Sequence, residues 1–169
     1  MAIDTTTIAD PQVQSFYELY LPQYTILRDF YIVLSAEQYE YRIVDTPERR
    51  SDTPRESLAH LLEYRLVVLN GVKTGIFEFK SMGVEHYWQA TKEQLLTAWE
   101  EFERDLFDYV TASGFESDAP VSTPWNVSLS KVNMLYLLRD HDILHVGWNL
   151  ALMDHLGIAR FPSLVAYWG

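Results

Sequence analysis

The chain has 169 residues and a formal net charge of −11, from 13 Lys and Arg against 24 Asp and Glu. This length predicts a single domain over residues 1–169, and the acidic balance argues against a nucleic-acid or anionic-membrane partner, because such binding depends on clustered cations. Cysteine is absent, which excludes disulfides, thiolate metal ligands and a cysteine nucleophile. Five histidines are left as the main candidates for chemistry near neutral pH.

The amino-terminal residues 1–7 carry neither the basic patch nor the apolar run of a secretion signal. No stretch of about 18 uncharged apolar residues follows that would span a membrane. We therefore expect a cytoplasmic protein without a membrane partner.

Four segments carry helical periodicity, and none reads as a strand. The first covers residues 12–35, and Pro22 inside it should kink the helix or split off its first turns. Its apolar positions alternate in steps of four and three, as the seam of a bundle helix requires: Val13, Tyr17, Tyr20, Tyr24, Leu27, Tyr31 and Leu34.

The second and third helices have clear start signals. Thr53 is the expected N-cap of the second, with Pro54 in the first turn and Glu56 completing a capping box. This helix should run to about Lys73. Thr91 and Gln94 form the same box for the third helix, which should end at Gly114. The apolar stripe of the third helix is Leu95, Trp99, Phe102, Leu106 and Tyr109.

The fourth helix should span Leu129 to Leu156 and stop at Gly157. Residues 117–124 read as a turn-prone connection, and residues 75–80 as a short extended piece or a loop. Four helices with seams of this period predict an all-α fold, a four-helix bundle with long crossover connections.

The fourth helix carries His141 and His145 one turn apart on one face, a spacing that lets two imidazoles converge on a metal ion. Unpaired imidazole nitrogens in an apolar seam are costly, and metal binding would satisfy much of this need. The seam that contains them is expected to point into the bundle: Met134, Leu138, His141, His145, Trp148, Leu152 and His155.

A third ligand is expected from a neighbouring helix. On the second helix, His60 shares one face with Tyr64, Val67 and Gly71. His60 is therefore the candidate third ligand beside His141 and His145. The alternative is that each is a hydrogen-bonded core histidine.

These residues resemble those of the DinB/YfiT-like superfamily. The similarity lies in residues 53–63 around His60, in residues 141–147 with the H-x-x-x-H pair, and in Gly157 and residues 161–162 downstream. It covers nearly the whole chain and implies a four-helix bundle with one divalent metal held by His60, His141 and His145. Two residues depart from the usual family pattern: Asp142 stands where Glu is common, and Trp148 replaces a Gln.

The resemblance also implies an activity. Members of known activity look like transferases that use low-molecular-weight thiols, such as bacillithiol or mycothiol, or like a thiol-dependent isomerase. We expect metal-dependent transfer or hydrolysis on a small-molecule substrate, with Zn, Ni, Fe and Mn all open as the metal. Because the chain lacks cysteine, any thiol must come from a small molecule. Aromatic residues make up 14% of the chain, with 11 Tyr, 8 Phe and 5 Trp. This content and the family resemblance also suggest a homodimer.

Three further residues are candidates for catalysis. Asp142 and Glu63 could orient a ligand or act as a base, although we expect their carboxylates mainly to be solvated. Tyr64 could line the pocket or simply pack in the core.

Two other readings stay open. His141-Asp142-Ile143-Leu144-His145 resembles the zinc peptidase pattern H-E-x-x-H with a shorter acid, and His155 would then be the third ligand. In the other reading the protein is not catalytic, and it is a metal-stabilised bundle or a small-ligand-binding protein. His86 is expected in a solvated loop.

Overall fold

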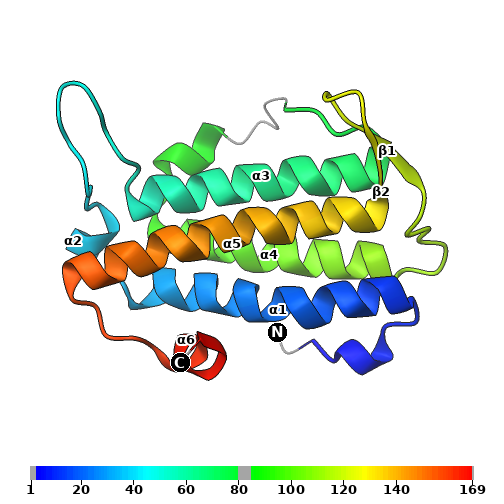
Figure 1. Ribbon diagram of the computed structural model, residues 1–169, viewed down its shortest axis with the longest axis horizontal. Helices are drawn as coiled ribbons and strands as arrows, with labels where there is room; N and C mark the ends of the chain where they lie inside the picture. Colours follow the sequence, from blue (N-terminus) through cyan, green and yellow to red (C-terminus); the bar gives the residue numbers. More distant parts are fainter. Residues whose placement is uncertain (1–2, 80–84, 169) are drawn as a thin grey trace.

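The computed structural model describes residues 3–79 and 85–168, and four long helices dominate it (Figure 1). They are α1 (Pro11–Val33), α3 (Pro54–Thr74), α4 (Lys92–Thr111) and α5 (Lys131–Leu156). The predicted all-α bundle is confirmed. No helix within the described ranges combines the length and the apolar character needed to span a bilayer.

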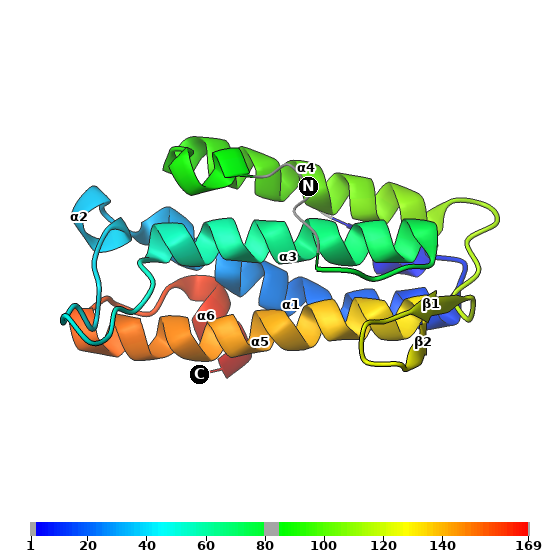
Figure 2. The same ribbon diagram turned by 90° about the horizontal axis from the view of Figure 1, so that it is seen from above.

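Around the bundle the helices follow the order α1, α5, α3, α4, so that α5 packs against both α1 and α3 (Figures 1 and 2). α3 and α4 run in the same direction, and the chain between them must return along the bundle (Figure 1). This is the long crossover that was expected. The connection from α1 to α3 reverses the chain at one end of the bundle, and the connection from α4 to α5 reverses it at the opposite end.

In the described parts of the chain, six short elements accompany the four long helices. The helical ones are η1 (Thr5–Thr7), α2 (Ala36–Tyr39), η2 (Glu85–Gln89) and α6 (Pro162–Trp168). The other two are strands, β1 (Pro120–Ser122) and β2 (Ser128–Ser130), which form an antiparallel hairpin.

The expectation that the chain contains no strand is therefore wrong, and part of the predicted turn at 117–124 is β1. Each strand has only three residues, which is too short for alternation to be visible in the sequence. The chain just after α3 runs beside β1. There the Phe77 amide donates a hydrogen bond to the Ser122 carbonyl at 2.8 Å, and Ile76 forms an isolated bridge with Ser122. Lys80, the last residue of the predicted extended piece, lies outside the described residues.

The predicted caps explain most helix ends. Thr53 and Thr91 each accept a hydrogen bond from the amide three residues on, and both capping boxes are complete. α3 ends at Gly75, whose φ of 77° is left-handed and favours glycine. α1 continues through Pro22 as one helix.

Two predicted helix ends are shifted. α4 ends at Thr111 with Ala112 as its cap, short of Gly114. α5 begins at Lys131 and not at Leu129, because Leu129 pairs in the hairpin and the Ser130 hydroxyl caps the helix.

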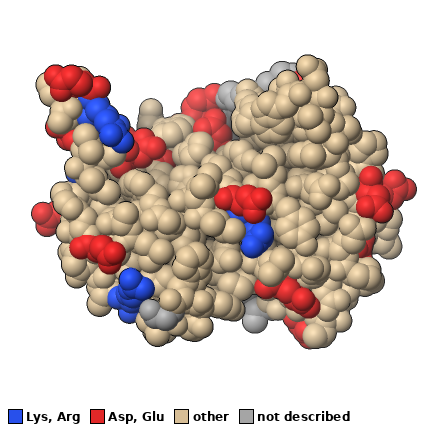
Figure 3. Space-filling model, viewed as in Figure 1, with Lys and Arg blue, Asp and Glu red and all other residues tan. Residues whose placement is uncertain are grey.

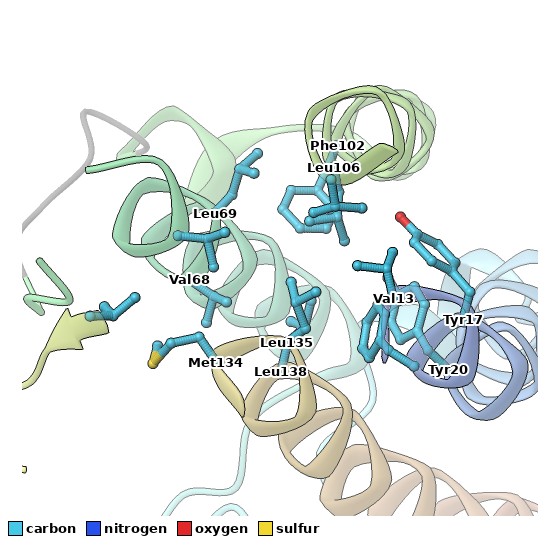
Figure 4. Close-up of a cluster of buried hydrophobic side chains, with 14 of the residues drawn as sticks. Val13, Tyr17, Tyr20, Val68, Leu69, Phe102, Leu106, Met134, Leu135 and Leu138 are labelled. Atoms are coloured by element: carbon cyan, nitrogen blue, oxygen red, sulfur yellow. The ribbon is translucent and has the colours of Figure 1, made fainter. Parts of the chain in front are cut away.

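Side chains from all four long helices meet in the core, where the predicted seams of α1 and α4 are largely buried (Figure 4). The apolar core falls into two clusters, one toward the hairpin end and one toward the α2 and α6 end. On α3, Arg65 lies between Leu62 of one cluster and Val67 of the other, and on α5 Asp142 lies between Leu138 and Val146. A polar layer thus divides the core.

The polar layer consists of Arg65, Asp142, Tyr20 and Glu103, all at most 3% exposed. The Arg65 guanidinium donates to Asp142 Oδ2 and to the Tyr20 hydroxyl, both at 2.5 Å, and the Tyr20 hydroxyl donates to Glu103 Oε2 at 2.7 Å. The guanidinium carbon also lies 3.7 Å from the ring centre of Trp99. Burial raises the pKa of Glu103 to about 7 and that of Asp142 to about 6.

Glu103 should make stability fall as the pH rises. Its pKa is near 4.5 in the unfolded chain and about 7 in the folded one, so its contribution is complete below pH 4.5 and is lost as the pH rises through 7. Relative to Glu103→Gln, the wild-type free energy of unfolding should fall by about 2 kcal/mol between pH 5 and 7.5. Urea unfolding at both pH values measures this. A constant difference between the two proteins would contradict it.

Candidate metal centre

His60 of α3 and His141 and His145 of α5 come together where these two antiparallel helices pack. One nitrogen of each ring lies within 4.8 Å of the others, and all three residues are half-buried. The Nε2 atoms of His60 and His141 are 3.2 Å apart. Zinc–nitrogen bonds of 2.0–2.1 Å in a tetrahedral site place two ligand nitrogens about 3.3 Å apart. The three predicted histidines are therefore brought together: the His60–His141 distance matches that of two ligands of one ion, and all three nitrogens are close enough that they could hold one metal.

The protonation of the two α5 histidines also suits a metal. Burial, followed by the neighbouring histidines, lowers the pKa of His141 to about 3. Burial, followed by His60, lowers the pKa of His145 to about 4. Both rings are thus neutral at pH 7 and keep a lone pair, which a metal ligand needs. A set of imidazoles suits Zn, Cu, Fe and Ni.

Ser57 orients His145, and it was not identified from the sequence. Its hydroxyl lies 2.9 Å from Nδ1 of His145 and 3.2 Å from the hydroxyl of Tyr31. When Nδ1 carries the proton and donates it to Ser57, Nε2 keeps its lone pair toward His60 and His141. The available signal was position: Ser57 precedes His60 by three residues, which places it on the same face of α3.

Ser57→Ala should weaken metal binding at least tenfold while the bundle stays folded, because partners of a ligating histidine typically contribute tenfold to a hundredfold. Competition titration with a zinc indicator measures the affinity. Ser163→Ala is the matched control, because Ser163 donates to Asp29 and contacts no histidine of the triad. Equal zinc affinity of the Ser57→Ala and Ser163→Ala variants would refute a role for Ser57.

Tyr64 lies against the triad. Its ring stacks on His141 with the ring centres 3.9 Å apart and the planes 20° apart. Burial raises the pKa of Tyr64 to about 12, so its hydroxyl is protonated at neutral pH and can donate a hydrogen bond. Nδ1 of His141 is buried and has no hydrogen-bond partner among the described residues.

Asp142 and Glu63 do not reach the histidines. The expectation that Asp142 is solvated is wrong: it is completely buried and bonded to Arg65. Glu63 is half-buried, and in the described ranges no hydrogen bond or ion pair joins either carboxylate to the triad.

The expected seam of α5 is also corrected. Between Leu138 and Leu152 the buried positions are Asp142, Val146 and Asn149. His141 and His145 lie to one side of this line and face α3. Trp148 is half-buried, and Gly147 beside it is exposed.

The two remaining histidines lie outside the triad. His155 is exposed in the last turn of α5, and its Nε2 is 2.8 Å from the hydroxyl of Tyr41. It follows His145 by ten residues, about 15 Å along a helix, so the peptidase reading loses its third ligand. His86 is exposed as expected, although it lies in η2 and not in a loop.

Comparison with known proteins shows that the fold of this chain is similar to that of solved structures. No protein-family model and no curated protein matches the chain. A solved structure from Exiguobacterium sibiricum, described as a member of the DinB family, superposes with a TM-score of 0.69 at 17% identity, over 92% of this chain and 98% of that one. A DinB-like protein from Bacillus subtilis superposes with a TM-score of 0.55 at 16% identity, over 88% and 95% of the two chains. The chain therefore has the fold of the DinB-like superfamily.

Proposed function

We propose that the protein is a metal-dependent enzyme in which His60, His141 and His145 hold one divalent transition metal. The observation that carries this proposal is the gathering of three ligand nitrogens within 4.8 Å on two neighbouring helices. Structural zinc sites usually have four protein ligands, whereas three protein ligands leave a position for water or a substrate, as catalytic sites do. Three ligands from this chain therefore favour a catalytic role.

The metal would supply Lewis acidity, which lowers the pKa of a bound water or thiol. The residues of the chain have supporting tasks. Ser57 holds the His145 ring through Nδ1, and Tyr64 packs on His141 and offers a protonated hydroxyl at the edge of the site. The chain contains no cysteine, so a thiol would enter as a small-molecule co-substrate. The proposed reaction is transfer to or from such a thiol, or hydrolysis.

Metal titration of tag-free protein tests the first part of this proposal. We expect one Zn²⁺ or Co²⁺ per chain, and at least a hundredfold weaker binding in each of His60→Ala, His141→Ala and His145→Ala, because two imidazoles alone hold zinc poorly. His155→Ala should bind metal as the wild type does. A wild-type protein without metal affinity, or a triad variant with unchanged affinity, would overturn the assignment.

A panel of low-molecular-weight thiols with model electrophiles and esters tests the second part. Turnover should require the metal and should be lost in the three triad variants. Stoichiometric metal binding without turnover on any substrate would favour the metal-stabilised, non-catalytic bundle.

A further inference from the structure

A pocket of about 390 Å³ opens directly beside the triad. His145 and Ser57 line it, and the rest of its wall comes from α5 and from the arm, which we define as residues 41–52 between α2 and α3. Its volume is in the range of small-molecule sites. A larger hollow of about 610 Å³ lies between η2 and α4, but none of the three histidines lines it.

One wall of the pocket is cationic. Arg49 and Arg50 of the arm line it, with Asp52 as the one acid among its lining residues. Within the described chain the Arg49 side chain makes no hydrogen bond or ion pair. Arg50 pairs with Asp45 at 2.9 Å, but both side chains are about 60% exposed, and exposed pairs of this kind are weak. Both guanidinium groups are therefore available to an anion, in a chain whose net charge is −11.

Other lining residues of the pocket are apolar. Leu144 and Trp148 of α5 line the pocket on either side of His145 along the sequence. Leu144 is 72% exposed, so packing within the chain does not account for it. Trp148 is, with Asp142, one of the two residues that depart from the pattern of the DinB/YfiT-like superfamily. A concave site lined by apolar side chains and a few polar groups is typical of small-molecule binding.

Interactions at the base of the arm fix its position beside the pocket that Arg49, Arg50 and His145 line. The Arg42 guanidinium pairs with Glu56 of α3 at 2.5 Å and donates to the Ser51 carbonyl. The Ser51 amide donates to the Val44 carbonyl at 2.9 Å, which ties the two sides of the arm together. In Figure 3 the arm projects at the upper left, beside a hollow at the edge of this face.

We propose that this pocket binds the substrate and that the substrate is a small organic oxyanion with a short apolar body. Its carboxylate or phosphate group would pair with Arg49 and Arg50, its body would lie along Leu144 and Trp148, and its reactive end would reach His145. Arginine forks match both oxyanions in geometry. This inference rests on the proposed function, because it names the substrate class of the same site.

Calorimetry with three probes that share a phenyl body tests the inference on zinc-loaded protein: phenylacetate, phenyl phosphate and the neutral phenylacetamide. Arg49→Gln/Arg50→Gln should weaken the binding of one or both anions about tenfold and leave phenylacetamide unchanged. The anion that loses more affinity identifies the preferred oxyanion. Trp148→Ala should weaken all three probes by a similar factor. Because a metal alone also attracts anions, the change caused by the arginine variant is the decisive quantity.

Arg104→Gln controls for the loss of one positive charge, because it removes a single arginine from an exposed position on α4, across the bundle from α5. It is compared with Arg49→Gln and Arg50→Gln as single variants and with the double variant. Equal anion affinities in Arg49→Gln/Arg50→Gln and Arg104→Gln would overturn the inference. Zinc affinity is measured first in every variant, so that a failure of this inference can be distinguished from a failure of the proposed function. Zinc binding without an effect of the arginines would overturn this inference alone, whereas absence of zinc binding would overturn the proposed function and this inference with it.

Discussion

Arg65→Met should lower the free energy of unfolding by about 3–5 kcal/mol, because it leaves two buried carboxyl groups without their cation. Arg65 is fully buried, donates to Asp142 and to Tyr20, and lies over the ring of Trp99. Methionine fills much of the same volume, so the loss reports the missing charge more than a cavity. Burial already raises the pKa of Asp142 and Glu103 with Arg65 in place. Without Arg65, both should rise further.

Urea unfolding at pH 7 measures this effect, and two further variants control it. Arg28→Met removes an exposed partner of Glu100 and should cost less than about 1 kcal/mol. Arg65→Met/Asp142→Asn removes one of the two unpaired carboxyl groups together with the arginine and should recover part of the loss. If Arg65→Met cost no more than Arg28→Met, the polar layer would not stabilise the bundle.

The bundle could be predicted because its helices carry local signals. The capping boxes at Thr53 and Thr91 and the seam of α1 are short-range patterns, and each depends on residues within one or two turns. The hairpin could not be predicted, because its strands are held by pairing across the chain and by packing of Val121, not by alternation along either strand.

The polar layer could not be predicted from the sequence either, for a different reason. Arg65 and Asp142 are 77 positions apart, and each looks like a surface charge on its own helix. Only the packing of α3 against α5 makes them a buried pair. The same pair displaced the expected seam of α5, since Asp142 occupies the core position that His141 was expected to take.

The triad itself could be proposed from the sequence, because the i, i+4 spacing of His141 and His145 is local and His60 shares one face of a neighbouring helix with Tyr64, Val67 and Gly71. The family resemblance supported the choice of His60. Ser57 could not be, since a serine near the start of a helix is common at exposed positions as well. Its contact with His145 spans 88 positions and depends on the register of α3 against α5.

Zinc should raise the melting temperature of the protein by roughly 8–16 °C. A ligand that binds only the folded state at 1,000 times its Kd adds about 4 kcal/mol to the free energy of unfolding, and in a domain of this size 1 kcal/mol corresponds to about 2–4 °C. The geometry favours such coupling, because His60 lies on α3 while His141 and His145 lie on α5. The unfolded chain offers no such preformed set of ligands.

Thermal unfolding of metal-free protein, with and without zinc, measures the shift, and a chelator should reverse it. His155→Ala should keep the full shift, because His155 is exposed and bonded to Tyr41 away from the triad. His60→Ala and His145→Ala should lose most of it, since each leaves only two ligands. These two variants separate a shared site from binding to α5 alone: a shift that survives in His60→Ala would place the metal on His141 and His145 without α3. In that case zinc would not link the two helices. Two coordination positions of the ion, and not one, would then be open to water or a substrate.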